Sequence, residues 1–404
     1  MADMQYKTQR YDKNRVIFSL IEEALFNKKS TPIEYPTDID FWEEIYREMR
    51  QQAVIALPFC VISEHREIPQ EYMYKWDQAR RDTIQRYVQM YSVQSLAIEL
   101  ISNAQIPVAV IKGTAAACYY PVPEFRNMGD VDLLVRPRDY RRAIDVLKEN
   151  GFRVVGEDGA RYHIMLTKYK VVFELHQSPG DVKKDPHGDA IRKYVVSGLR
   201  SVEMNTLGPD AFPILPWKQN GMELLWHIKQ HLYNGLGLRQ IFDWMMFVNH
   251  WLDNDHFREY EKDLRICGLE KLAIHVTRMC QMHFGLREEG ISWCCQADEV
   301  LCEELLAFIM EQGNFGHKRG KKDKISKVFS KYTNPVLFIS QLQEIGVRDW
   351  MLLKKMPWLR PMAWMYAGVW EFRNVTAQSR SPFRFAKEVM KGKRRARMLR
   401  KLYG

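Results

Sequence analysis

The first hundred residues carry apolar side chains at intervals of three and four, which is the spacing of one face of an α-helix. The pattern runs through three stretches, RVIFSLIEEALF, IDFWEEIYREMRQQAVIALPFCVI and RRDTIQRYVQMYSVQSLAIELISNA. Thr37 and Asp38 stand just ahead of the second stretch, and residues of these types cap helices. Residues 1–105 are therefore predicted to form an N-terminal helical region.

After residue 105 the pattern changes to short runs rich in β-branched residues. Gly113 and Thr114 supply a turn and a helix N-cap ahead of three alanines, and PRDYRRAIDVLKENG reads as a capped helix ending at Gly151. We expect residues 106–205 to form a small mixed α/β core. Its predicted strands are 106–112, 130–136, 152–156, 161–168 and 171–177.

Helical spacing returns at about residue 219, in two amphipathic halves broken at Gly235 and Gly237. It continues from Leu264 to Phe284 and from Asp298 to Met310. We expect residues 206–320 to be a helical domain closing over the core, and residues 321–404 to be a basic, aromatic-rich helical region. The predicted fold class is α+β, with a small mixed sheet flanked by helical regions.

Composition fits a folded protein of 404 residues with 46% hydrophobic and 27% charged residues. No apolar run approaches the roughly 18 residues of a membrane-spanning helix, and the first residues lack the apolar segment of a signal peptide. Seven cysteines form no C-x-x-C pair. We therefore expect a cytoplasmic protein, with peripheral membrane association as an alternative.

The formal net charge is +10, and basic residues are dense in RSPFRFAKEVMKGKRRARMLRKLYG at the end of the chain. This segment is a candidate for weak contact with an anionic membrane or nucleic acid, and a solvated terminal helix is the alternative. The stretch MPWLRPMAWMYAGVWEF (356–372) is compatible with an interfacial helix, although a packed core helix is the commoner outcome for such a pattern.

Residues 127–137 read NMGDVDLLVRP, an apolar run interrupted by Asp130 and Asp132. Alternate residues of a strand share one face, so the two carboxylates lie on the same side. Like charges held this close require a bound cation, a lysine or arginine partner, or a solvated surface. The three apolar residues that follow Asp132 indicate a buried strand and so disfavour the solvated surface.

Glu174 lies in a similar setting, between two apolar residues in VVFELHQ. Three carboxylates on strands of one small sheet suit a hard cation, Mg²⁺ or Mn²⁺. Such ions serve phosphoryl and nucleotidyl transfer, because they orient the triphosphate and stabilise charge on its oxygens. Pairing of Glu174 with a basic residue is the alternative. His176 shares the face of Glu174, and the pattern leaves open whether it lies at the site or in the core.

The turn in VIKGTAAA adds a candidate phosphate site. Gly113 lets the backbone approach a phosphate closely, and the first N–H groups of the following helix, with the Thr114 hydroxyl beside them, would hold anionic oxygens. Lys112 would add positive charge there. Arg126, in the loop before the aspartates, could reach a phosphate or the leaving pyrophosphate.

Four polar residues of the following helical segment stand at helical spacing. His227 and His231 are four residues apart, as are Arg239 and Asp243. A zinc site of the H-E-x-x-H type would need glutamate at position 228, which is isoleucine. We expect His231, Arg239 and Asp243 to line the nucleotide or acceptor side, and a structural ion pair is the alternative.

The order of strand, Gly-Thr turn, helix, D-x-D strand and later acidic strand resembles the DNA polymerase β-type nucleotidyltransferase superfamily. Within it, VIKGTAAACYYPVPEFRNMGDVDLLV followed by FELHQ resembles the uncharacterised bacterial nucleotidyltransferase family. A lysine-glycine turn, an arginine-containing loop, Gly-Asp-x-Asp and an acid-Leu-His strand recur in that family. The likeness covers roughly residues 20–285, and Thr114 replaces the serine usual in the superfamily.

The resemblance implies that Asp130 and Asp132 are catalytic metal ligands, with Glu174 as the third carboxylate, a ligand or a base. Together with the reading of the residues, it predicts a nucleotide site formed by Lys112, Gly113, Thr114, Arg126, Gly129, His176, His231, Arg239 and Asp243.

The function expected from the sequence is metal-dependent nucleotidyl transfer. Mg²⁺ or Mn²⁺ is the expected cofactor, a nucleoside triphosphate (NTP) is the donor, and pyrophosphate is released. The acceptor is a small molecule, a glycan or a protein. Two alternatives remain open: a protein adenylyltransferase of regulatory or toxin type, and a non-catalytic nucleotide- or nucleic-acid-binding module.

Overall fold

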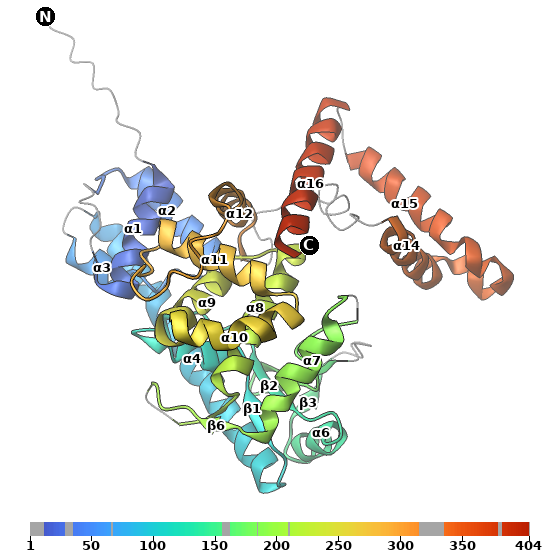
Figure 1. Cartoon of the computed structure of the whole chain (residues 1–404), viewed down its shortest axis with the longest axis horizontal. Coiled ribbons are helices and arrows are strands. Elements are labelled where there is room, and N and C mark those ends of the chain that lie inside the picture. The colour runs from blue at the N-terminus through green and yellow to red at the C-terminus, as the bar shows by residue number, and fades with distance from the viewer. Residues whose placement is uncertain are drawn as a thin grey trace, which may run out of the picture.

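A computed structural model describes residues 12–28, 35–65, 68–155, 162–183, 185–208, 211–314, 335–378 and 382–403. Within these residues, helices surround one seven-stranded mixed sheet (Figure 1). The α+β prediction is confirmed.

The sheet has the strand order β3-β4-β5-β2-β1-β7-β6. Its central strand β2 runs antiparallel to β1 and parallel to β5. All residues of β1 and β2 are buried, as expected for strands covered on both faces. The strands are β1 (Val108–Val110), β2 (Val131–Val135), β3 (Arg153–Val154), β4 (His163–Lys168), β5 (Val171–His176), β6 (Glu203–Met204) and β7 (Pro213–Ile214).

Short helices connect the strands. The first turn departs from the prediction, because Lys112 occupies the N-cap position and Thr114 lies inside the helix. The connecting helices are α5 (Gly113–Ala117), α6 (Tyr140–Glu149) and α7 (Gly188–Ser197), with 3₁₀ turns η1 (Pro123–Phe125) and η2 (Gly198–Arg200).

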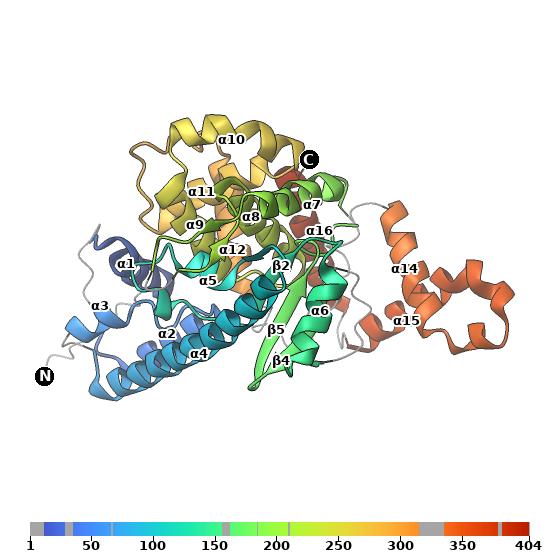
Figure 2. The same ribbon diagram turned by 90° about the horizontal axis from the view of Figure 1, so that it is seen from below.

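The N-terminal region is helical, as predicted. The capping prediction at its second helix is also confirmed, since the Asp38 side chain accepts from the backbone N–H of Asp40. The helices are α1 (Lys13–Phe26), α2 (Ile39–Gln51), α3 (Phe59–Glu64) and α4 (Gln70–Asn103). Helix α4 has 34 residues and extends from beside α2 and α3 to the sheet (Figure 2).

A second group of helices packs on the other side of the sheet. The predicted break at Gly235 and Gly237 is confirmed, but the helix expected from Leu264 to Phe284 is two helices. They are separated by a turn at Gly268, whose φ of +62° suits glycine. The helices are α8 (Trp217–Asn234), α9 (Leu238–Trp251), α10 (Asn254–Ile266), α11 (Glu270–His283) and α12 (Glu299–Gln312).

Two hydrophobic cores meet near the sheet. The larger core joins α1 to α3 with α7 to α12, and the smaller core lies between the sheet, α6 and the second half of α4. Trp76 of α4 belongs to the larger core and Met90 to the smaller one, so this helix links the two. The predicted division into four regions stays a prediction, and the N-terminal helices share their core with residues of the 206–320 region.

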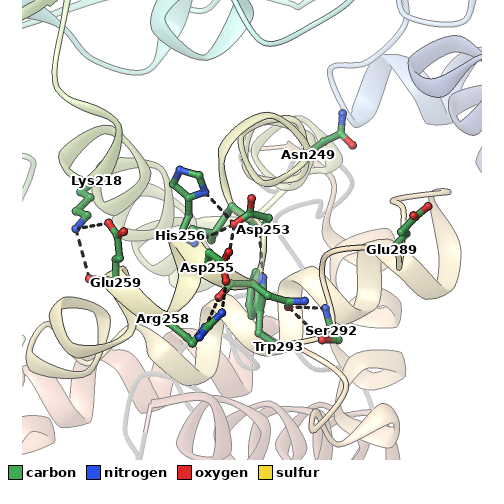
Figure 3. A network of polar contacts seen from close by, with 12 residues as sticks. Lys218, Asn249, Asp253, Asp255, His256, Arg258, Glu259, Glu289, Ser292 and Trp293 are labelled. Carbon is green, nitrogen blue, oxygen red and sulfur yellow. Dashed lines mark hydrogen bonds and ion pairs between the residues drawn. The ribbon is translucent and has the colours of Figure 1, made fainter.

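Polar contacts fix the turn between α9 and α10, at the surface of the helical group (Figure 3). The Asp253 side chain caps α10 by accepting from the backbone N–H groups of Asp255 at 3.0 Å and His256 at 2.9 Å. Trp293 Nε1 donates to the Leu252 carbonyl oxygen at 3.1 Å. This network closes the loop after α11 onto the start of α10, away from the carboxylate strands.

The last part of the chain has two forms of packing. Helix α16 (Pro382–Tyr403) lies against α11 and α12, whereas α14 (Pro335–Asp349) and α15 (Ala363–Gln378) project from the main body (Figures 1 and 2). Between α14 and α15 lie the 3₁₀ turns η5 (Met351–Lys354) and η6 (Pro357–Met362). Among the described helices, none is both long and apolar enough to cross a bilayer.

Candidate active site

The two predicted aspartates lie at the start of β2. Asp130 directly precedes the strand and Asp132 is its second residue. Arg86 of α4 holds the loop before them, because its guanidinium donates to the carbonyl oxygens of Met128 at 2.9 Å and Gly129 at 2.7 Å. Helix α4 thereby fixes the position of the loop backbone directly before Asp130.

Glu174 completes a carboxylate triad with these residues. It lies in β5 opposite Asp132, in parallel register. One oxygen from each of Asp130, Asp132 and Glu174 lies within 4.8 Å of the other two. An all-oxygen donor set of this kind fits Mg²⁺ or Mn²⁺.

The pKa of Asp130 shows that the protein leaves this negative charge incompletely balanced. Burial, and then the neighbouring charges of Asp132 and Glu174, raise that pKa to about 7. A bound cation would favour the ionised form, so the electrostatics of the triad agree with its donor atoms.

His176 lies between two of the carboxylates of the candidate site. Its Nε2 is 2.8 Å from Asp132 Oδ1 and 3.2 Å from Glu174 Oε2. Burial alone would lower the pKa of His176, but the bonds to both carboxylates raise it overall. In turn, burial opposes ionisation of Asp132, yet Lys112 and His176 lower its pKa overall.

Lys112 reaches the site from a strained backbone. Its φ is 56° and its ψ −136°, a sparsely populated region for a residue with a side chain, which costs about 1–3 kcal/mol. In this conformation the Lys112 ammonium group lies 3.5 Å from Asp132 Oδ1 and 3.6 Å from Glu223 Oε1. Burial lowers the pKa of Lys112, but the two carboxylates raise it overall.

Helix α8 contributes three polar side chains, Glu223, His227 and His231. They follow one another at intervals of four residues, so they share one helical face. Burial raises the pKa of Glu223 to about 7. Burial also lowers the pKa of His231 to about 4 and that of His227 well below its ordinary value, so both imidazoles are neutral at pH 7.

Two of the predicted nucleotide-binding side chains, Arg126 and Asp243, are bound to each other. Asp243 is buried in a bidentate ion pair with Arg126, at 2.6 Å and 2.8 Å, and also accepts from the Tyr120 hydroxyl at 2.9 Å. Asp243, for which the alternative was an ion pair with Arg239, pairs with Arg126. Arg239 donates to the Asn127 carbonyl oxygen at 3.1 Å.

The Thr114 hydroxyl is also engaged. It is fully buried and its Oγ1 donates to Gln94 Oε1 of α4 at 2.7 Å. The side chain thus anchors α5 to α4, and its predicted contact with phosphate has no support in this geometry. Gly113, with a φ of +34°, presents its backbone to the cavity.

A cavity of about 200 Å³ brings most of the predicted residues together. Those that line it are Lys112, Gly113, Arg126, Gly129, Asp130, Asp132, Glu174, His176, His231 and Arg239. Thr114 and Asp243 lie outside the lining.

Sequence reasoning missed several residues of this cavity. Tyr162, His163, Gly180 and Gln230 line it, and Glu223 lies beneath it against Lys112. The repeat of Glu223 with His227 and His231 along one helical face was a usable signal. His163 had no such signal in the sequence. It lies at the cavity because it pairs opposite His176 in the antiparallel β4–β5 ladder, and strand register is not visible in the chain order.

Three clustered carboxylates at a small mixed sheet, in a cavity that also holds Lys112 and Arg239, are the kind of arrangement that nucleotidyl transfer requires. A family model described as uncharacterised nucleotidyltransferase matches residues 39–285. The chain belongs to this family, which confirms the resemblance inferred from the motifs. A comparison with curated proteins gave no match.

Proposed function

We propose that the protein transfers a nucleoside monophosphate from an NTP to an acceptor, with Mg²⁺ or Mn²⁺ as cofactor. In this reaction an acceptor oxygen forms a bond to the α-phosphorus, the bond from that phosphorus to the bridging oxygen breaks, and pyrophosphate leaves. The observation that carries the proposal is the triad of Asp130, Asp132 and Glu174, with oxygens within 4.8 Å of one another in a cavity that Lys112 and Arg239 also line.

Asp130, Asp132 and Glu174 would hold the cation, which when bound stabilises charge on phosphate oxygens. Lys112 and Arg239 bring positive charge to the cavity wall and would orient the phosphates. Gly113 has no side chain, so the backbone of the cavity wall can approach the phosphates closely there. A cavity of about 200 Å³ is smaller than the roughly 300–1,000 Å³ of typical ligand pockets, so it suits the phosphates and not the whole nucleotide.

The first test is a thermal-unfolding panel with each of the four ribonucleoside triphosphates, with and without Mg²⁺. We expect at least one nucleotide to raise the Tm of the wild type only when Mg²⁺ is present, because a ligand at 100 times its Kd adds about 2.7 kcal/mol to stability. The double variant Asp130→Asn/Asp132→Asn should lose this rise.

A matched control removes two aspartates of the surface. Asp145 and Asp189 are exposed, so Asp145→Asn/Asp189→Asn should keep the full rise in Tm. The proposal fails if no nucleotide shifts the wild type, or if the site variant responds as the wild type does.

The acceptor class can be assigned by pyrophosphate release. The wild type would be supplied with the responsive nucleotide and with a cell lysate separated by dialysis into macromolecules and small molecules. If pyrophosphate is released when the small-molecule fraction is added, the acceptor is a small molecule. Release that follows the macromolecules, with a nucleotide adduct on a protein in mass spectra, points to protein nucleotidylation.

A further inference from the structure

The hairpin of α14 and α15 stands apart from the rest of the molecule (Figures 1 and 2). It begins at residue 335, well beyond the family match at residues 39–285. None of its residues lines the candidate active site. The hairpin therefore has no evident part in holding the nucleotide, and its surface calls for a separate explanation.

Among the described side chains of the hairpin, small residues and Leu342 are buried, and several large apolar ones are exposed. Ala363 and Ala367 of α15 are 0% exposed. A Cβ atom added at Gly346 of α14 would lie 1.9 Å from the Ala363 carbonyl oxygen, so the two helices touch backbone to backbone. Small residues at such a contact allow close approach, as they do between helices in membranes.

The large side chains lie on the outside of this pair. Trp358 is 69% exposed and Trp370 47%. Trp364, Met365 and Val369 of α15 are exposed, and so are Trp358 and Met362 of the preceding 3₁₀ turn η6. This arrangement inverts the usual pattern of a helix in water, where the large apolar side chains face the core. The prediction of a packed core helix for residues 356–372 is wrong for these side chains.

The net positive charge of the chain lies mostly in its last part. Residues 335–403 contain fifteen lysines and arginines against four acidic residues, while the net charge of the whole chain is +10. Most of this excess belongs to α16, and residues 335–378 contain five lysines and arginines against three acidic residues. Between Trp350 and Trp370 there is no acidic residue, and Lys355 and Arg360 are exposed.

We propose that the α14–α15 hairpin is a docking surface for an anionic lipid bilayer. Exposed tryptophans and methionines would enter the interfacial region, where tryptophan is favoured, and Lys355 and Arg360 would reach the phosphate groups. Exposed apolar side chains, together with a segment from 351 to 369 that carries basic and no acidic residues, match such a surface. The contact proposed is with the membrane surface.

The test is co-sedimentation of the full chain with vesicles. One vesicle type is equal parts phosphatidylglycerol and phosphatidylcholine, and the other is phosphatidylcholine alone. We expect binding to the anionic vesicles, weakened about tenfold or more in Trp358→Ser/Trp364→Ser/Trp370→Ser because apolar contact is lost. Lys355→Gln/Arg360→Gln should weaken binding to the anionic vesicles, since each basic residue near such a surface contributes to attraction.

A matched control removes three exposed apolar side chains elsewhere. Tyr74, Met204 and Val300 are 74%, 57% and 69% exposed, and Tyr74→Ser/Met204→Ser/Val300→Ser should bind like the wild type. Circular dichroism of each variant confirms that it is folded.

Two results would overturn the proposal. One is that the wild type fails to bind anionic vesicles, or that the tryptophan variant binds them as well as the wild type does. The other is that sedimentation without lipid shows a wild-type dimer that the tryptophan variant makes monomeric, which would assign the surface to a second copy of the chain. Neither result bears on nucleotide binding, which the thermal-unfolding panel tests separately.

Discussion

Arg126 and Asp243 form an ion pair whose two charges are both removed from water. Their side chains are 4% and 2% exposed. Removing one partner leaves the other charge buried and uncompensated, so Asp243→Asn should lower the free energy of unfolding by about 3–5 kcal/mol. Urea denaturation followed by circular dichroism measures this loss.

The control for this prediction is an ion pair in water. Asp255 and Arg258 are 78% and 75% exposed, and Asp255→Asn should leave stability nearly unchanged. Equal losses in Asp243→Asn and Asp255→Asn would show that burial does not govern the strength of the Arg126 pair.

Glu223 makes the stability of the protein depend on pH. Burial raises its pKa to about 7, whereas in the unfolded chain it is about 4.3. Between these values the folded state binds the proton and the unfolded state has lost it, so stability falls as the pH rises through this window. Glu223→Gln cannot ionise and escapes this loss.

Comparison of Glu223→Gln with the wild type at pH 5 and pH 8 tests this assignment. Relative to the wild type, the variant should be more stable at pH 8 than at pH 5, by up to about 3 kcal/mol. Urea denaturation in the presence of a chelator gives both differences. A difference that is the same at both pH values would contradict the raised pKa.

The chain order reveals a site residue when its role follows from its near neighbours. Asp130, Asp132 and Glu174 were predictable because alternation in a strand fixes the face on which each side chain lies. The partner of Arg126 was not predictable, since 117 residues separate it from Asp243 and only packing brings them together. The partner of the Thr114 hydroxyl was likewise not predictable, since the acceptor, Gln94 of α4, lies twenty residues earlier in the chain.

At the scale of elements, periodicity predicts those long enough to contain a period. The strands β1 to β5 were expected within a few residues of their bounds, although β3 has only two residues. By contrast, β6 and β7 have two residues each, and their pairing depends on tertiary contacts. The helix expected across residue 268 failed for a related reason: the apolar spacing continues through Gly268, but the backbone turns there.

Helix α16 tests whether ion pairs or apolar contacts hold a terminal helix. Lys391, Arg394 and Lys401 pair with acidic residues of α12 and its N-cap, but all these basic side chains are more than 40% exposed. Leu402 on the same helix is 0% exposed. We expect Leu402→Ala to cost about 2–5 kcal/mol, because it leaves a cavity in the larger core.

The matched variant Lys391→Gln/Arg394→Gln/Lys401→Gln should cost less, since each exposed pair contributes only about 0–1 kcal/mol. Urea denaturation of both variants gives the comparison. A greater loss in the triple variant would mean that charge, and not apolar burial, docks this basic helix.

At the scale of the whole molecule, the cavity lies where the two cores meet. The carboxylates belong to β2 and β5, whose apolar residues pack in the smaller core, while α8 and α9 supply His231 and Arg239 from the larger core. A nucleotide that contacts both the strands and these two helices must restrict the motion of both. Hydrogen exchange can therefore distinguish a site that spans the two cores from one confined to the sheet.

We expect Mg²⁺ and the nucleotide that raises the Tm to slow amide exchange in residues 131–135 and 171–176, and also in residues 217–251. Asp130→Asn/Asp132→Asn should show neither effect under the same conditions. Helix α10, which faces away from the cavity, provides an internal reference whose exchange should not change. A nucleotide held by α8 and α9 stabilises those helices against local opening. Protection limited to the two strands would therefore mean that His231 and Arg239 support the fold and do not hold the nucleotide.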